Sequence, residues 1–454
     1  MLDYFAEVKK RGAKCPPLYA RGQITRVVGM TLEARGINVA MGSRCQIERP
    51  DGETAEVEVV GFDGSKTFLM PLHRIDSLRP GTPVWPAASD AMVPVGSALL
   101  GRVVDGVGEP LDDKGPLKNP EFVDFYPPAI NPLQREPITQ PLDVGVRSIN
   151  SVLSLGCGQR VGLFAGSGVG KSVLLGMMTR FTNADVVVVA LVGERGREVR
   201  EFVESNLGVT GMRKAVVVAA PADDTPVMRL RAGLYASRIC EQFRDSGLKV
   251  LLLFDSLTRY AQAQREIALA AGEPPATRGY PPSVFARLPQ LVERAGNGCG
   301  NGGSVTGLYT VLTEGDDLND PVADSARAIL DGHVVLSRRI AAEGIYPAVD
   351  IQASISRSMQ QIVSSEQWTL ANRLNQLIAR YAESKDLISV GAYTPGIDAL
   401  TDQAIQKQAA IREFLRQSLD DAVDLSESFS ALQNLIDSPA AVDGGEVQDP
   451  RVVR

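Results

Sequence analysis

The hydrophobic and polar positions of this chain follow different periods in successive regions. Within residues 19–91, short stretches such as 23–27 and 55–59 alternate apolar with polar side chains, and glycines and Asp-Gly pairs separate them. Alternation with period two and regular turn signals predicts several short, half-buried strands. We therefore expect a small β-barrel or β-sandwich over this region.

Residues 92–345 show a second pattern, in which continuous apolar runs alternate with segments of helical period. Runs of this kind are typical of strands whose two sheet faces are both covered by helices. Strands that alternate with helices predict a mostly parallel α/β sheet. The predicted strands are residues 160–164, 186–192, 215–219, 250–254 and 304–313.

The two ends of the chain differ from this centre. Residues 346–437 have mostly helical spacing, with the clearest stretches at 368–383 and 400–433. Residues 1–18 form one short helical pattern, and 438–454 carry too little apolar content to pack. The predicted fold is a multidomain α/β protein with an N-terminal β-barrel, a central α/β domain and a C-terminal helical domain.

Composition excludes several classes of protein. The 454 residues include 47 Lys and Arg against 54 Asp and Glu, a net charge of −7, so we expect no nucleic-acid partner. Five widely spaced cysteines form no CxxC pair, and two histidines argue against a His-rich metal site. With no signal-peptide pattern and no apolar run near 18 residues, we expect a soluble cytoplasmic protein.

The strongest chemical signal is the segment 165–172, Ala-Gly-Ser-Gly-Val-Gly-Lys-Ser, between a predicted strand and a predicted helix. This is the context of a phosphate-binding P-loop, in which glycine N–H groups and a helix N-terminus converge on phosphate oxygens. Lys171 would reach the β- and γ-phosphates of ATP, and Ser172 would ligate Mg²⁺. The residues predicted to bind the nucleotide are Ala165, Gly166, Ser167, Gly168, Val169, Gly170, Lys171, Ser172 and Val173.

Two acidic residues follow apolar strands near this loop in the predicted sheet. Asp255 ends the run 250–254 and would hold Mg²⁺ through a water molecule. Glu194 follows the run 186–192, where it would polarise the water that attacks the γ-phosphate. A helix-capping role for the charged residues around Glu194 explains the same pattern, and the residues alone leave these two interpretations equal.

Arg357 lies far from the P-loop in the sequence, at the end of residues 347–357. An arginine in such a place is a candidate arginine finger, which neutralises charge in the transition state of phosphoryl transfer. A salt-bridging surface arginine is the alternative.

Together these segments resemble the rotary ATPase α/β superfamily over nearly the whole chain. Residues 101–112 look like the family's entry to its nucleotide-binding domain, and 347–356 fit its Ser-x-Ser signature. More narrowly, the chain resembles the flagellar type III export ATPases. The segments that carry this narrower resemblance are 165–178, 193–199, 310–317 and 324–333.

The resemblance implies roles for individual residues. Glu194 would be the catalytic carboxylate, with Lys171 as the catalytic lysine, and Arg195 and Arg259 would face the γ-phosphate. Arg357 would act in trans on the nucleotide of a neighbouring subunit. The residues expected to contact adenine are Tyr346, which would stack on it, and Tyr393, a second wall.

The same resemblance implies Mg²⁺-dependent ATP hydrolysis by a homohexameric ring that energises flagellar protein export. Implied partners are regulator and stalk proteins, export chaperones and substrates, and the export gate of the inner membrane, where the ring would lie peripherally. Three alternatives remain: the ATPase of a virulence type III secretion injector, a ring-shaped nucleic-acid translocase with a similar core, and a non-catalytic nucleotide-binding ring subunit. The acidic charge balance argues against the translocase, and Glu194 argues against the non-catalytic subunit.

Overall fold

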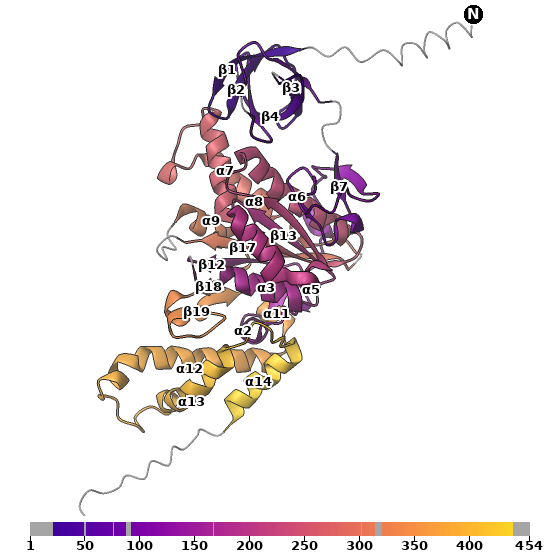
Figure 1. Ribbon diagram of the computed structural model, residues 1–454. Coiled ribbons are helices and arrows are strands. Elements are labelled where there is room, and N and C mark those ends of the chain that lie inside the picture. The colour runs from indigo at the N-terminus through magenta and orange to yellow at the C-terminus, as the bar shows by residue number, and fades with distance from the viewer. Residues whose placement is uncertain are drawn as a thin grey trace, which may run out of the picture.

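The protein has three parts stacked in line, with a barrel at one end and helices at the other (Figure 1). This is the predicted fold class. The predicted helix at 1–18 and nearly all of the predicted tail lie outside the described residues. The computed structural model describes residues 21–49, 51–75, 77–87, 92–166, 168–300, 302–313 and 320–438.

The N-terminal part is a closed antiparallel barrel of six strands in the order β1-β2-β5-β4-β3-β6. The alternation in the sequence explains its core, because Ile24, Leu32 and Val57 point inward and are almost fully buried. The barrel strands are β1 (Gly22–Val28), β2 (Thr31–Arg35), β3 (Arg44–Glu48), β4 (Thr54–Asp63), β5 (Lys66–Pro71) and β6 (Pro83–Pro86).

The central part is a nine-stranded sheet in the order β19-β18-β12-β17-β15-β13-β14-β8, with β16 paired to β17. Only β19 and β16 pair antiparallel within it. The sheet reaches beyond residue 345, the predicted domain boundary, because β19 is its edge strand. Its strands are β8 (Val103–Val104), β12 (Arg160–Ala165), β13 (Val186–Val192), β14 (Ala215–Ala220), β15 (Lys249–Asp255), β16 (Gly296–Asn297), β17 (Ser304–Leu312), β18 (Gly332–Leu336) and β19 (Val349–Ser356).

Helices cover both faces of this sheet, which explains its continuous apolar strands. Along β13, Val188 belongs to the core shared with α6, α7 and α8, whereas Val187 belongs to the core shared with α3. Both valines are fully buried. The helices of this part are α2 (Arg147–Val152), α3 (Lys171–Phe181), α4 (Gly196–Glu201), α5 (Gly208–Met212), α6 (Pro226–Asp245), α7 (Leu257–Ala270), α8 (Pro282–Val292), α9 (Pro321–Ile329) and α10 (Arg338–Ala342).

Short elements complete the central part. A π-helix follows α4, and two two-stranded sheets pair β7 with β9 and β10 with β11. These elements are η1 (Ser97–Leu99), η2 (Pro132–Gln134), η3 (Phe202–Leu207), η4 (Thr277–Gly279), β7 (Met92–Val95), β9 (Glu121–Asp124), β10 (Pro141–Leu142) and β11 (Leu155–Gly156).

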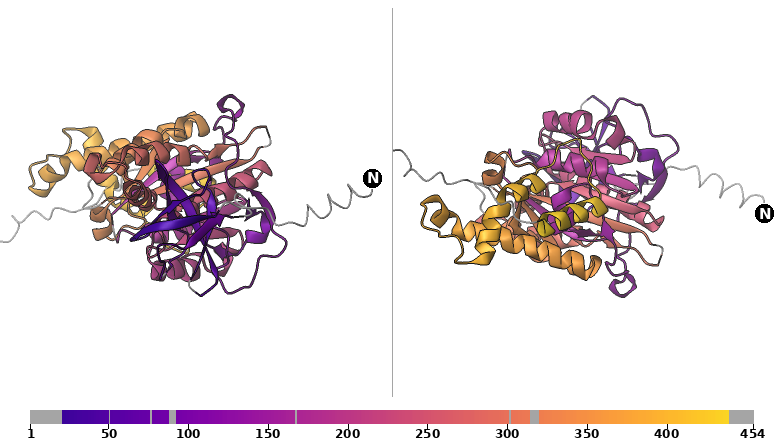
Figure 2. Two further views of the ribbon diagram at one scale, coloured as in Figure 1. Left: turned by 90° about the horizontal axis from the view of Figure 1, so that it is seen from above. Right: turned by 90° about the horizontal axis from the view of Figure 1, so that it is seen from below.

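The C-terminal part consists of α11 (Met359–Ile362), α12 (Ser365–Ser389), α13 (Ala399–Leu415) and α14 (Leu425–Asp437). Seen from below, these helices cover only part of the lower end of the central domain (Figure 2). The helical stretch predicted at 400–433 is interrupted, and Asp424 starts the last helix with a capping box. Among the described residues, no helix has the length and apolar character needed to cross a membrane.

Candidate functional site

The P-loop connects the carboxyl end of β12 to the start of α3. Gly168 and Gly170 have φ angles of 79° and 91°, values that favour glycine, and Gly170 caps α3 without a side-chain hydrogen bond. A Cβ atom at Gly168 would meet nothing within 4 Å, so this side of the loop is open. The loop backbone and the N-terminus of α3 therefore form a cradle that fits phosphate groups. Ser167 lies outside the described residues.

Next to this cradle, one lysine and two carboxylates come together. Lys171 starts α3 after the loop that follows β12, Glu194 follows β13, and Asp255 ends β15. The Nζ atom of Lys171 lies 2.6 Å from Oδ1 of Asp255 and 3.2 Å from Oε1 of Glu194. Thr310 on β17 donates to the same Asp255 oxygen at 2.7 Å. These side chains are 13% (Lys171 and Glu194) and 3% (Asp255) exposed. We call Lys171, Glu194 and Asp255 the catalytic cluster.

Burial and the neighbouring charge of Asp255 raise the pKa of Glu194 to about 7, although Lys171 acts in the opposite direction. The pKa of Lys171 is raised, because both carboxylates outweigh its desolvation. A carboxylate that titrates near neutral pH suits a group that accepts a proton from, or polarises, a water molecule. Ser172 is exposed in the first turn of α3, so its hydroxyl and Asp255 fit a Mg²⁺ ion beside the phosphates.

The residues that follow Glu194 orient this carboxylate. Glu198 on α4 shares a hydrogen bond with Glu194, and Arg195 donates to Glu198 at 3.0 Å. The N-cap residue of α4, Arg195, makes no side-chain capping hydrogen bond, and Glu198 lies in the first turn of this helix. Arg195 is 78% exposed and points to Glu198 in this structure.

Arg259, in the first turn of α7, lies against the turn that carries Glu194. A Cβ atom at Gly193 would come within 2.8 Å of the Arg259 Cβ, so the arginine stem packs directly on this glycine. Its guanidinium donates to Gln262 at 3.0 Å. The structure thus brings Arg259 to the edge of the catalytic cluster.

A mainly apolar cavity of about 330 Å³ adjoins the P-loop. The Tyr346 ring forms one side, 3.6 Å from the Cβ position of Gly170. The other wall was not predicted. It consists of the loop residues Gln417, Ser418 and Leu419, which belong to no sequence motif and whose place depends on contacts with distant parts of the chain. Tyr393 does not line this cavity, and its hydroxyl contacts Asp402 at 2.8 Å and the Asp398 carbonyl.

Arg357 lies at the opposite end of the sheet strands. β18 runs parallel to β12, so β18 begins at the end remote from the P-loop. Gly332 at the start of β18 pairs with Ser356, which places Arg357 at that remote end. Arg357 is exposed and donates to the Leu330 carbonyl at 3.1 Å. The structure therefore does not bring Arg357 to the P-loop of the same chain.

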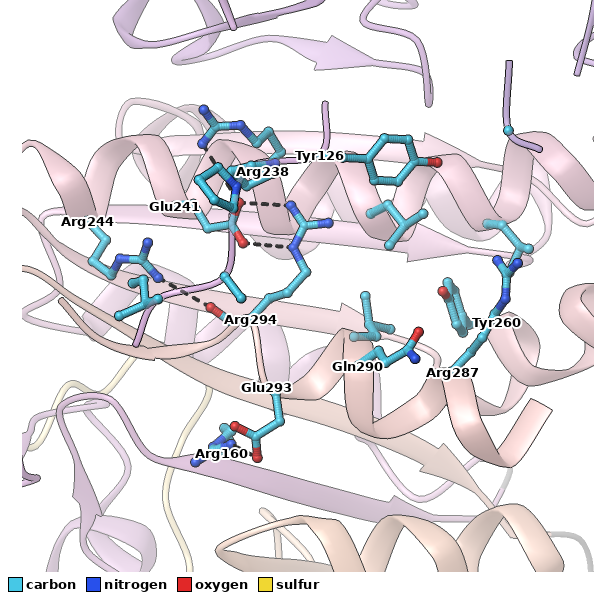
Figure 3. Close-up of a pocket in the computed structure, with 18 of the residues that line it drawn as sticks. Tyr126, Arg160, Arg238, Glu241, Arg244, Tyr260, Arg287, Gln290, Glu293 and Arg294 are labelled. Carbon is cyan, nitrogen blue, oxygen red and sulfur yellow. Dashed lines mark hydrogen bonds and ion pairs between the residues drawn. The ribbon is translucent and has the colours of Figure 1, made fainter. Parts of the chain in front are cut away.

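A second cavity, of about 1450 Å³, is not the phosphate site (Figure 3). Six arginines belong to its lining, and acidic side chains compensate several of them. Arg294, for example, makes two hydrogen bonds of 2.7 and 2.8 Å to Glu241. None of the P-loop residues that the structure describes lines this cavity.

Two family models match the chain. The nucleotide-binding domain of the ATP synthase alpha/beta family matches residues 145–356, and the T3SS EscN ATPase C-terminal domain matches residues 363–434. The first match contains the P-loop, the catalytic cluster, Tyr346 and the strand before Arg357.

Curated relatives and solved structures agree with these models. The flagellum-specific ATP synthases of Pseudomonas aeruginosa and Salmonella typhimurium are 59% and 54% identical, covering 91% and 92% of this chain and 93% and 94% of their own. The assembled ATPase EscN of the enteropathogenic E. coli type III secretion system superposes with a TM-score of 0.86 at 41% identity, over 91% of this chain and 100% of that chain. A structure of EscN with its central stalk EscO gives a TM-score of 0.83.

Proposed function

The chain belongs to the ATP synthase alpha/beta family and is an ATP hydrolase of the type III export class; from this premise we propose that it energises flagellar protein export as a Mg²⁺-dependent ring ATPase. The observation that carries the proposal is the catalytic cluster beneath an open P-loop. The cluster supplies a phosphate-binding cation, a ligand for a metal-bound water and a carboxylate that titrates near neutral pH.

In this proposal, the P-loop backbone and Lys171 hold the β- and γ-phosphates of ATP, and Tyr346 packs against adenine. When bound, Mg²⁺ neutralises charge on the phosphate oxygens, held by Ser172 and through water by Asp255. Arrival of the phosphates draws Lys171 away from Glu194, which leaves the carboxylate free to orient the attacking water. Arg195, which follows Glu194, and Arg259, which packs on Gly193, would serve the γ-phosphate side.

Arg357 completes the site of a neighbouring subunit. Its own P-loop lies at the other end of the strands, so its action on a nucleotide requires a second chain placed head to tail. Repetition of that contact closes a homohexameric ring, and the assembled state of EscN supports this arrangement. Hydrolysis then depends on assembly.

The flagellar assignment follows from relatives named flagellum-specific ATP synthases at 44–59% identity. A type 3 secretion system ATPase of Xanthomonas euvesicatoria is 47% identical, so an injector ATPase is the second candidate. By analogy with EscN and EscO, we infer a stalk protein as a partner. We also infer a regulator, export chaperones and substrates, a membrane export gate and a cytoplasmic place beside it.

A mixing experiment tests the shared site. Arg357→Ala and Lys171→Ala are each expected to be inactive, because one lacks the finger and the other the phosphate contact. In a mixed ring, an intact P-loop meets an intact Arg357 at some interfaces, so mixing should restore activity. The measurement is the recovery of Mg²⁺-dependent ATPase activity. A mixture of Arg357→Ala with Glu194→Gln should recover activity for the same reason and serves as the matched comparison. Activity in Arg357→Ala alone would contradict a role in trans.

Swimming motility tests the flagellar role. In a host that lacks its own flagellar export ATPase, this chain should restore secretion of flagellar subunits, and Glu194→Gln should not. Restoration of effector secretion in an injector mutant, without motility, would favour the second candidate.

A further inference from the structure

A second group of titratable residues lies where the barrel joins the central domain. His73 follows β5 of the barrel, whereas Asp105 and Glu109 flank the tight turn after β8. One ligand atom from each residue lies within 4.8 Å of the other two. Because His73 and Glu109 are exposed, small side-chain rotations suffice to bring the three donors around one cation. We call these three residues the junction cluster.

Asp105 is the fixed member of the junction cluster. It is only 4% exposed, and its Oδ1 atom accepts the N–H groups of Val107 and Glu109 at 2.9 and 2.8 Å. In the described part of the chain, Oδ2 accepts no hydrogen bond and faces the His73 Nε2 atom at 3.9 Å. Among the described residues, this buried side chain therefore holds one carboxylate oxygen that is turned toward His73 and has no hydrogen-bond donor.

The surroundings leave this negative charge incompletely balanced. Asp224 lies close enough to add to it, and burial together with the nearby Asp223 and Asp105 raises the pKa of Asp224. The only ion pair of Asp105 in the described residues is the long one with His73.

We propose that His73, Asp105 and Glu109 bind a divalent transition-metal cation, with Zn²⁺ as the best fit, at the junction of the barrel and the nucleotide-binding domain. One imidazole nitrogen and two carboxylate oxygens are the donor types that Zn²⁺ takes, and water supplies the fourth position. Mg²⁺ prefers oxygen donors in octahedral geometry and fits this set poorly.

The position of the junction cluster links it to both neighbouring parts. Thr225 donates to the Leu72 carbonyl at 2.7 Å, which fastens the loop after β14 to the residue before His73. In the same loop, the Ala222 N–H donates to the Glu194 carbonyl at 2.9 Å. A cation at the junction cluster would therefore tie His73, which follows the residue that Thr225 contacts, to the turn after β8.

Metal binding is tested on the full chain, stripped with EDTA and kept free of nucleotide. Titration with Zn²⁺ by calorimetry, with metal analysis after gel filtration, should give one tight site per chain. His73→Gln and Glu109→Gln should each weaken it by about 10- to 100-fold or more, since loss of even an outer-shell partner costs this much. Asp105 is left unchanged because it holds its turn, and His333→Gln and Cys299→Ser are the matched controls.

The two histidines of the chain allow a direct readout. With ¹⁵N-labelled histidine, one imidazole resonance should move on addition of Zn²⁺, and it should be absent in His73→Gln. His333, whose Nε2 contacts the Ala353 carbonyl at 3.0 Å, should not respond. Equal Zn²⁺ affinity in His73→Gln and the wild type, or displacement of Zn²⁺ by equimolar Mg²⁺, would overturn the proposal.

Discussion

The catalytic cluster and the junction cluster are alike in composition but differ in the cation that faces their carboxylates. Each has a buried aspartate with a carboxylate oxygen turned to a basic side chain, and each adds one glutamate. In the catalytic cluster the base is Lys171, at 2.6 Å from Asp255. In the junction cluster it is His73, 3.9 Å from Asp105 and 55% exposed.

This difference determines what each cluster requires. Lys171 has a raised pKa and stays charged at every physiological pH, so the catalytic cluster is balanced until phosphates displace the lysine. The junction cluster has no such residue. Lys171 keeps the catalytic cluster ready to bind the anionic phosphates. His73 neutralises the carboxylates of the junction cluster less well, so a metal ion can bind there.

The largest effect is expected from Lys171→Ala. It removes the cation that the phosphates bind and leaves two buried carboxylates to repel ATP, so kcat/KM should fall by about 10³-fold. Equilibrium binding of a fluorescent ATP analogue and steady-state hydrolysis measure both losses. ATP affinity equal to that of the wild type would contradict the assignment of Lys171.

Glu194→Gln should separate binding from chemistry. The amide preserves shape but cannot polarise water, so ATP binding should persist while turnover falls by about 10²-fold or more. Glu198→Gln is the matched control: it removes the negative charge of a neighbour of Glu194 and keeps its shape, and a loss below about 10-fold is expected. Turnover equal in Glu194→Gln and the wild type would exclude the catalytic role.

The raised pKa of Glu194 predicts a pH dependence of stability in the nucleotide-free protein. Because the folded state binds this proton more tightly than the unfolded state, where the pKa is near 4.5, stability falls as pH rises from about 4.5 to about 7. The loss amounts to at most about 3 kcal/mol. Thermal unfolding between pH 5 and 8 should show a smaller decline in Glu194→Gln, and parallel curves would contradict the shift.

His73→Gln should have the smallest effect when metal is absent. His73 is largely exposed and, among the described residues, makes one long ion pair, so the stability of the metal-free variant should change by no more than about 0.5 kcal/mol. Its ATPase activity in EDTA-treated buffer, restored with Mg²⁺, should match that of the wild type. Added Zn²⁺ should raise the unfolding temperature of the wild type and not of the variant.

Site residues whose placement depends only on the elements next to them in the sequence were predictable. The P-loop needs only a strand, glycines and a helix start in succession, and Asp255 and Glu194 each follow an apolar strand directly. Parallel strands end at the same edge of a sheet, so these residues could be expected to meet. The alternation in residues 19–91 predicted the strands and their inward faces, since period two places one side-chain face inside. Closure into a barrel, where the sequence also allowed a sandwich, follows from the strand pairing.

Other features depend on tertiary structure because they join segments far apart in the chain. The wall formed by Gln417 to Leu419 reaches the cavity through hydrogen bonds of Gln417 to the backbone at residues 145 and 147. The position of Arg357, remote from its own P-loop, depends on the antiparallel register of β19. The presence of only two histidines argued against a His-rich metal site. The packing of the barrel against the central domain is what brings His73 close to Asp105 and Glu109. Sequence determines local geometry and chemistry, whereas register and domain packing decide which of these groups meet.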